Sequence, residues 1–202
     1  MPARGFRPGS FAGGLPMETL FTAFKTKAEM ASAEVHRFAD RAAAREFLFE
    51  LLNGEGVLAG PPGGALWADR GLLDGPARER LAQAAPGVGF QVTREAAAAA
   101  RVGISAADWA IADTGTLVFD AAPVEQRLVS TLPPIHVAFA ATGRILPDLP
   151  AALERLDPSR SGYISFITGP SRTADIERVL TIGVHGPARL LVLFVDDFEG
   201  GL

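Results

Sequence analysis

The sequence contains no cysteine among its 202 residues. Disulfides, a cysteine nucleophile and thiolate ligation of zinc or of an iron–sulfur cluster are therefore excluded for this chain. Lysine is also scarce, since it occurs only at Lys25 and Lys27, and the formal net charge is -4. Nucleic-acid binding usually requires a basic surface. No such excess of positive charge is present, so we expect no nucleic-acid partner.

Long apolar runs are missing as well. Residues 190–195 form the longest useful run, whereas a membrane-spanning helix needs about 20 apolar residues. No basic segment followed by an apolar one marks a signal peptide. We therefore expect a cytoplasmic protein without a membrane span. Residues 1–16 are rich in Gly and Pro without hydrophobic periodicity, which predicts a disordered leader before a single domain over residues 17–202.

What the chain does have is a globular composition, with 48% hydrophobic and 21% charged residues. Hydrophobic periodicity predicts strands that alternate with helices. The expected helices are 18–31, 41–53 (capped by Asp40), 76–85, 95–101, 147–156 and 173–181, with a capping box at Ser105 and Asp108. The expected strands are 57–59, 90–93, 109–112, 116–120, 135–140, 163–168 and 190–195. Because the inner strands are apolar on both faces, we predict an α/β fold, a single domain with a mainly parallel sheet flanked by helices.

Ligands of open α/β sheets bind beyond the carboxyl ends of the strands, so the loops there are candidate sites. Residues 60–64 (GPPGG) either cradle a phosphate or form a plain turn. Prolines remove N–H donors and the spacing fits no phosphate-binding motif, which favours the turn. In residues 112–117 (ADTGTL), Asp113 and Thr114 either bind a ligand or bond their own backbone, while Gly115 permits a tight turn.

Residues 169–177 (GPSRTADIE) form the third candidate. If a helix starts near Thr173, its free N–H groups, the Ser171 hydroxyl and the Arg172 guanidinium would hold an anion. Alternatively, Thr173 only caps that helix, while Asp175 and Glu177 favour its dipole. Both interpretations remain open.

The three histidines are scattered. His185, in residues 183–187 (GVHGP), is expected near a helix C-terminus, where a protonated imidazole is favoured, so it is either an acid–base group or structural. His36 is expected on a helical surface stretch, and His136 lies within an apolar strand. Their spacing predicts no metal site.

Four segments in order, residues 110–119, 132–139, 169–177 and 183–187, resemble the LUD-domain proteins, most closely the short lactate-utilisation protein C type. The resemblance covers residues 17–195. It implies a fold like that of the sugar-phosphate isomerase and coenzyme A transferase superfamily. It also implies a role in bacterial oxidation of L-lactate to pyruvate beside iron–sulfur partner subunits, without a cofactor of this chain's own. The motif positions that it marks are Asp113, Thr114, Gly115, Gly169, Ser171, Arg172, Thr173, Asp175, Glu177, His185 and Gly186.

Two functions follow as expectations. The first is an accessory subunit of such a lactate-oxidising system. The second is a stand-alone enzyme or binding domain for a small carboxylate, a sugar phosphate or a coenzyme A ester, that is, for a small anionic ligand. In the second case the candidate catalytic residues are Asp175, Glu177 and His185. The candidate ligand-binding residues are Asp113, Thr114, Gly115, Gly169, Ser171, Arg172 and Thr173.

Overall fold

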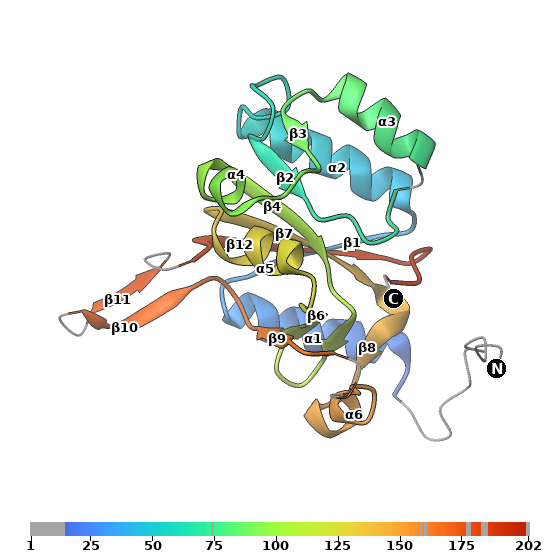
Figure 1. Cartoon of the computed structure of the whole chain (residues 1–202). Helices are drawn as coiled ribbons and strands as arrows, with labels where there is room; N and C mark the ends of the chain where they lie inside the picture. The colour runs from blue at the N-terminus through green and yellow to red at the C-terminus, as the bar shows by residue number, and fades with distance from the viewer. Residues whose placement is uncertain are drawn as a thin grey trace.

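The computed structural model describes residues 15–73, 75–157, 159, 161–176, 179–182 and 186–200. A six-stranded parallel sheet forms the centre of this part of the chain (Figure 1). Its strand order is β1 (Glu34–Phe38), β12 (Arg189–Val195), β7 (Ile135–Ala141), β4 (Val102–Ala106), β2 (Ala65–Trp67) and β3 (Val88–Gly89). The expected α/β fold with a mainly parallel sheet is confirmed.

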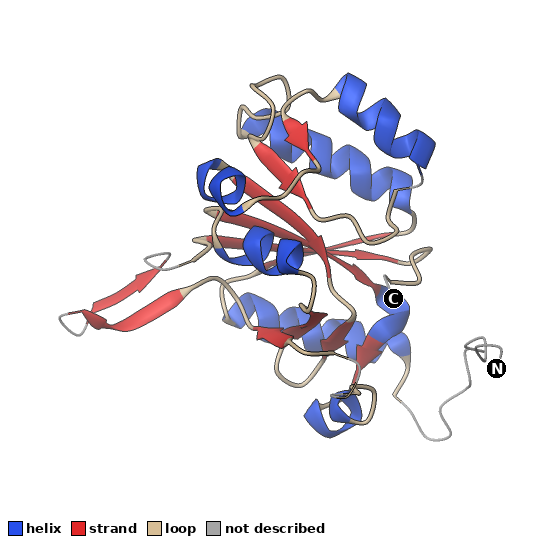
Figure 2. Ribbon diagram, in the orientation of Figure 1, coloured by secondary structure: helices blue, strands red, loops and turns tan. Residues whose placement is uncertain are grey.

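Both faces of this sheet are buried, as its apolar inner strands predict. Along β7, Val137 and Phe139 pack into the core beneath α2 (Arg41–Gly54) and α3 (Gly75–Ala84). Ala138 and Ala140 point to the opposite face, into the core formed with α1 (Met17–Met30). Helices α4 (Arg94–Ala99) and α5 (Val124–Thr131) complete the covering (Figure 2). Asp40 caps α2 as expected, since its Oδ1 accepts a hydrogen bond from the Ala43 N–H at 2.8 Å.

A second, four-stranded sheet packs with α1 on that opposite face. Its order is β8 (Ile145–Leu146), β5 (Trp109–Ile111), β6 (Thr116–Asp120) and β9 (Ile164–Ile167). The short helices η1 (Thr142–Arg144) and α6 (Leu149–Leu153) lie beside β8 along the chain. The sequence predicts β5, β6 and β9 as strands but not that they form a separate sheet. Strands β5 and β6 are antiparallel, so the Asp-Thr-Gly turn joins them as a hairpin.

The helix expected over residues 173–181 is wrong. Strands β10 (Arg172–Ile176) and β11 (Val179–Ile182) form an antiparallel hairpin instead. It projects from the body of the molecule (Figure 1). Five of its residues, Thr173, Ile176, Val179, Thr181 and Ile182, are β-branched. Such side chains lose χ1 freedom in a helix and fit a strand better.

Four other local predictions are also wrong. The strand expected at 90–93 does not form, and the nearby strand is β3 at Val88–Gly89. His36 lies on β1, not on a helix, and its ring stacks with Phe38 and lies tilted against Phe47. The strand expected at 57–59 is a turn, and the strand begins only at Ala65. Ser105 is part of β4 and caps no helix. Pairing with neighbouring strands, which the local pattern does not contain, decides where each strand forms.

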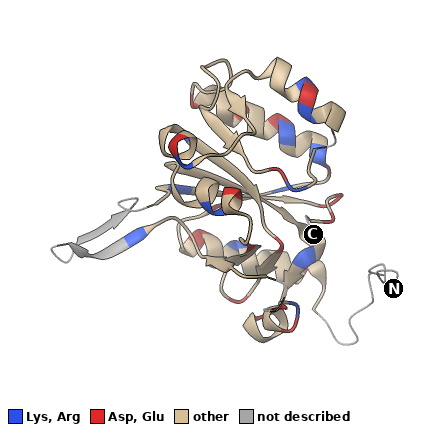
Figure 3. Ribbon diagram, viewed as in Figure 1, with Lys and Arg blue, Asp and Glu red and all other residues tan. Residues whose placement is uncertain are grey.

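Acidic and basic side chains are interspersed along helices such as α2 and α3 (Figure 3). No helix in the described ranges has both the length and the apolar character to cross a membrane. Residues 1–14, most of the predicted leader, lie outside the described residues.

Candidate functional site

Two of the sequence motifs meet at one pocket, beside the amino ends of β7 and β12 and the carboxyl end of β9. The cavity measures about 290 Å³. Its lining comes from α5, β7, β9, the loop after β9 and the segment that enters β12: Ser130, Thr131, His136, Phe166, Ile167, Thr168, Gly169, Ser171, Gly186, Pro187 and Leu190. The loops at 169–171 and 186–187 therefore lie side by side, at the amino edge of the parallel strands.

Backbone contacts join the two motifs. The N–H of Ser171 donates to the carbonyl of Pro187 at 2.8 Å. Gly186 packs directly on Ser171, since a Cβ at Gly186 would lie 3.0 Å from the Ser171 Cβ. Such an approach is tighter than ordinary van der Waals contact, so a side chain at position 186 would press on the Ser171 hydroxyl.

Hydroxyl groups make up the polar wall of this pocket. Ser130 and Thr131, at the end of α5, both donate to the carbonyl of Arg127, at 3.2 and 2.6 Å. The Ser171 hydroxyl has no hydrogen-bond partner among the described residues. The pocket therefore offers uncharged donors and acceptors to a small polar ligand.

His136 forms the buried side of the pocket, and only 1% of it is exposed. Its Nε2 shares a hydrogen bond of 2.7 Å with the Ser105 hydroxyl on the neighbouring strand β4. Burial lowers the pKa of His136 to about 3, so the ring is neutral near pH 7. Sequence reasoning placed His136 in an apolar strand but did not identify it as a pocket residue. Its hydrogen-bond partner Ser105 lies on a strand that only the fold places beside β7, so no local sequence signal marked His136.

Arg172 is not among the residues that line this pocket. Its Nη2 donates to the carbonyl of Ala31 and, at 3.2 Å, to the hydroxyl of Ser32, at the end of α1. Gly169 has a φ of +72° and packs against the same carbonyl of Ala31. The predicted helix N-terminus is also absent because residues 172–176 are a strand. Arg172 and Gly169 therefore dock the base of the hairpin on α1.

The Asp-Thr-Gly turn lies next to the Ser171 loop but borders a different pocket. The hydroxyls of Thr116 and Thr168 share a hydrogen bond of 2.7 Å, which links the end of the turn to the end of β9. Asp113, however, lines a separate cavity of about 470 Å³ against α1. Asp113 and Thr114 are exposed, whereas Gly115 is buried against Ala28.

The candidate catalytic residues are not brought into the pocket by any described contact. Asp175 lies on β10, as does the candidate ligand-binding residue Thr173. Glu177 and His185 lie outside the described residues. Their catalytic roles therefore stay predictions.

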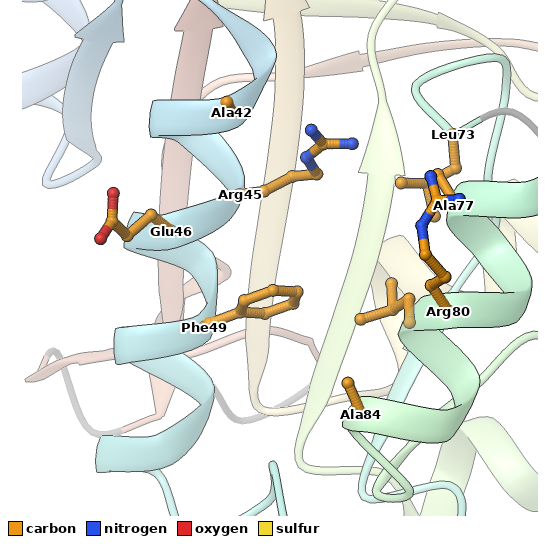
Figure 4. Close-up of a pocket in the computed structure, with 9 residues that line it drawn as sticks. Ala42, Arg45, Glu46, Phe49, Leu73, Ala77, Arg80 and Ala84 are labelled. Carbon is orange, nitrogen blue, oxygen red and sulfur yellow. The ribbon is translucent and has the colours of Figure 1, made fainter.

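Further pockets lie elsewhere on the surface. One of about 350 Å³ separates α2 from α3; there Arg45 and Phe49 extend from α2 toward α3, while Glu46 points away (Figure 4). None of the predicted site residues lines it. Within the described ranges, no group of three or more His, Asp or Glu side chains is placed to hold a metal ion.

Comparison with known proteins gives consistent results. The LUD domain family matches residues 21–195. Lactate utilization protein C of Exiguobacterium sp. is 37% identical over 113 residues, which cover 53% of this chain and 49% of that protein. Lactate utilization protein C 1 of Bacillus mycoides is 37% identical over 107 residues, which cover 50% and 46%. The chain spans about half the length of these curated relatives. The crystal structure of a DUF162 family protein from Deinococcus radiodurans shares the fold, with a TM-score of 0.56, 16% identity, and coverage of 90% of this chain and 99% of that one.

Proposed function

Because the chain belongs to the LUD domain family, we propose that it is an accessory subunit of a system that oxidises L-lactate to pyruvate with iron–sulfur partner proteins. The observation that carries this proposal is the family match over residues 21–195, together with relatives named Lactate utilization protein C.

In this proposal, the absence of cysteine decides which proteins carry the electrons. Oxidation of lactate to pyruvate releases two electrons and two protons. A chain without thiolates cannot hold an iron–sulfur cluster of the cysteine-ligated type. The electrons therefore pass to clusters on the partners, and this subunit contributes binding or assembly.

A deletion strain tests the role. We expect it to stop growing on L-lactate as sole carbon source, to grow normally on pyruvate, and to recover on lactate when the gene is restored. Affinity purification of the tagged chain from lactate-grown cells should recover protein-bound iron and acid-labile sulfide. Normal growth of the deletion strain on L-lactate would contradict the proposal.

A second candidate function is an enzyme or binding domain for a small carboxylate, a sugar phosphate or a coenzyme A ester. The hydroxyl-lined pocket around Ser171 and Gly186 favours it. In this version Asp175 or Glu177 moves a proton. Turnover by the purified chain should then be lost in Asp175→Ala and retained in Glu154→Ala, a change at an exposed carboxylate after α6. Equal turnover in both variants would remove Asp175 from the mechanism.

A further inference from the structure

A surface groove lies between helices α2 and α3. It is the cavity of about 350 Å³ shown in Figure 4. On α2 its lining includes positions 42, 45 and 49, and on α3 it includes positions 77, 81 and 84. Residues three, four or seven positions apart lie on one face of a helix. Each helix therefore presents one continuous strip to the groove.

The floor of the groove is apolar, and the side chains at its rim are small. Leu73 and Leu81 are buried, and Phe49 is partly buried against the same core. Ala42 and Ala84 are exposed at the surface. Because alanine side chains are short, they allow another helix to approach closely. A groove of this shape accepts the apolar face of an amphipathic helix.

Two arginines on facing helices line the groove. Arg45 extends from α2 toward α3, whereas its neighbour Glu46 points away from the groove (Figure 4). Arg80 lies on α3. Neither arginine forms a hydrogen bond, an ion pair or a ring contact within the part of the chain that the structure describes. Other arginines pair with carboxylates, namely Arg37, Arg41, Arg70, Arg101 and Arg189.

These two guanidinium groups favour an anionic partner. Arg45 is partly buried and lies on the same helix face as Phe49. A guanidinium loses its water more readily than an ammonium group does, and it holds a carboxylate with two parallel hydrogen bonds. Two positive charges that line one cavity also repel each other, and a carboxylate between them removes that repulsion. The groove therefore matches a partner that is apolar on one face and acidic beside it.

We propose that this groove binds an acidic, amphipathic helix of a partner protein. The helix places apolar side chains over Phe49 and Leu81 and its carboxylates beside the two arginines. Helix α3 has 10 residues and so spans about 15 Å, which matches about three turns of a partner helix. Because Ala42, Arg80 and Ala84 are exposed, the groove is open, whereas a small-molecule pocket encloses most of its ligand. The open rim therefore favours a helix.

The subunit role proposed above requires an interface but assigns it to no surface. The groove supplies such a surface, and the identity of its partner rests on the proposed function. Binding of an acidic helix to the groove is measured separately, with a synthetic peptide, so the groove and the subunit role fail separately.

Fluorescence anisotropy of a labelled peptide tests the groove on the purified full chain. The peptide has about 14 residues, with leucine at i, i+3, i+4 and i+7 and glutamate on either side of that stripe. The matched peptide has lysine in place of every glutamate. We expect the glutamate peptide to bind about tenfold more tightly than the lysine peptide. The difference should shrink in about 0.5 M salt, because salt screens exposed charges.

Charge-reversed variants locate the binding site. Arg45→Glu combined with Arg80→Glu should weaken binding of the glutamate peptide about tenfold and reverse the preference in favour of the lysine peptide. If that protein does not fold, Arg80→Glu alone, at an exposed position, should still weaken the glutamate peptide several-fold. Arg94→Glu is the matched control. Arg94 is exposed on α4 and lines no part of the groove, so the peptide affinity should stay within about twofold.

Three results of the peptide measurements overturn the proposal. The first is a wild-type protein that binds neither peptide at up to about 1 mM, the weak end of specific binding. The second is equal affinity for the two peptides, or an unchanged affinity in the folded variants. The third is tighter binding of octanoate than of the glutamate peptide, which would assign the groove to a small amphipathic anion.

The same variants then test the partner in lactate-grown cells. The tagged wild type and Arg94→Glu should co-purify with protein-bound iron and acid-labile sulfide, whereas the variant with both Arg45→Glu and Arg80→Glu should not. Iron retained by that variant would overturn the groove as the interface. Iron missing from the purified wild type would contradict the proposed function, and the peptide measurements would then decide the groove.

Discussion

Acidification should destabilise the protein through one buried histidine. His136 is almost fully buried, and its Nε2 is bonded to the Ser105 hydroxyl. Burial lowers its pKa from 6.5 to about 3. The folded protein therefore keeps the ring neutral, whereas the unfolded chain protonates it near pH 6.5.

The sign and size of the effect follow from this difference. Between pH 6.5 and about 3 the unfolded state binds a proton that the folded state does not, so the free energy of unfolding falls as the pH falls. Each pH unit in this window corresponds to about 1.4 kcal/mol. The loss is about 2 kcal/mol at pH 5 and reaches about 5 kcal/mol at pH 3, which is comparable to the whole stability of a small domain.

Urea unfolding of the wild type and of His136→Gln, at pH 7 and pH 5, measures the effect. Glutamine does not titrate, and its amide can still bond Ser105. The stability advantage of the wild type over the variant should therefore shrink by about 2 kcal/mol from pH 7 to pH 5. Burial raises the pKa of Asp108, which acts in the opposite direction, but both proteins contain Asp108 and its contribution cancels.

His36→Gln is the matched control, because the His36 ring lies on a partly exposed strand position. Its burial also lowers its pKa, so the same trend should appear with a smaller slope. A wild-type advantage over His136→Gln that stays constant or grows on acidification would refute the reasoning.

Two further substitutions test the packing of the Asp-Thr-Gly turn and the cap of α2. Gly115→Ala should lower the free energy of unfolding by at least about 2 kcal/mol, because φ is +66° and the new Cβ would overlap the Ala28 backbone. Gly143→Ala, with no atom within 4 Å, should change it by less than about 0.5 kcal/mol, and equal melting temperatures of the two variants would contradict this reasoning. Asp40→Ala should cost about 1 kcal/mol in chemical unfolding by removing the cap of α2, and a loss no larger than that of the exposed Glu50→Ala would argue against the cap.

The sequence predicts the fold class because the alternation of buried side chains is a property of each strand by itself. Val137 and Ala138 show this, since neighbouring residues on one strand enter opposite cores. Which strands pair is a long-range property, and the separate sheet of β5, β6, β8 and β9 was therefore not predicted. The same limit explains the hairpin at 172–182, where β-branched residues outweigh the apparent helix signals.

The sequence identified candidate site residues by their motifs, but it did not predict which of them lie together. Ser171 and Gly186 lie in contact, and the sequence marked both as motif positions without predicting that they touch. The partner of Arg172, the carbonyl of Ala31, depends on how α1 docks and leaves no trace in the local sequence. Arg45 and Arg80 also belong to different segments, and only the packing of α2 beside α3 places them on one groove.

The last turn of α1 receives two loops that are far apart in the sequence. Gly115 rests on Ala28, and Gly169 rests on Ala31. A change at either glycine that displaces this turn also removes the support for the other loop. The losses in free energy of unfolding from changes at the two glycines should therefore not be additive. The Asp-Thr-Gly turn and the base of the hairpin thus belong to one cooperative unit. Local unfolding of α1 would release both loops together, with the hydroxyl-lined pocket between β7, β9 and β12.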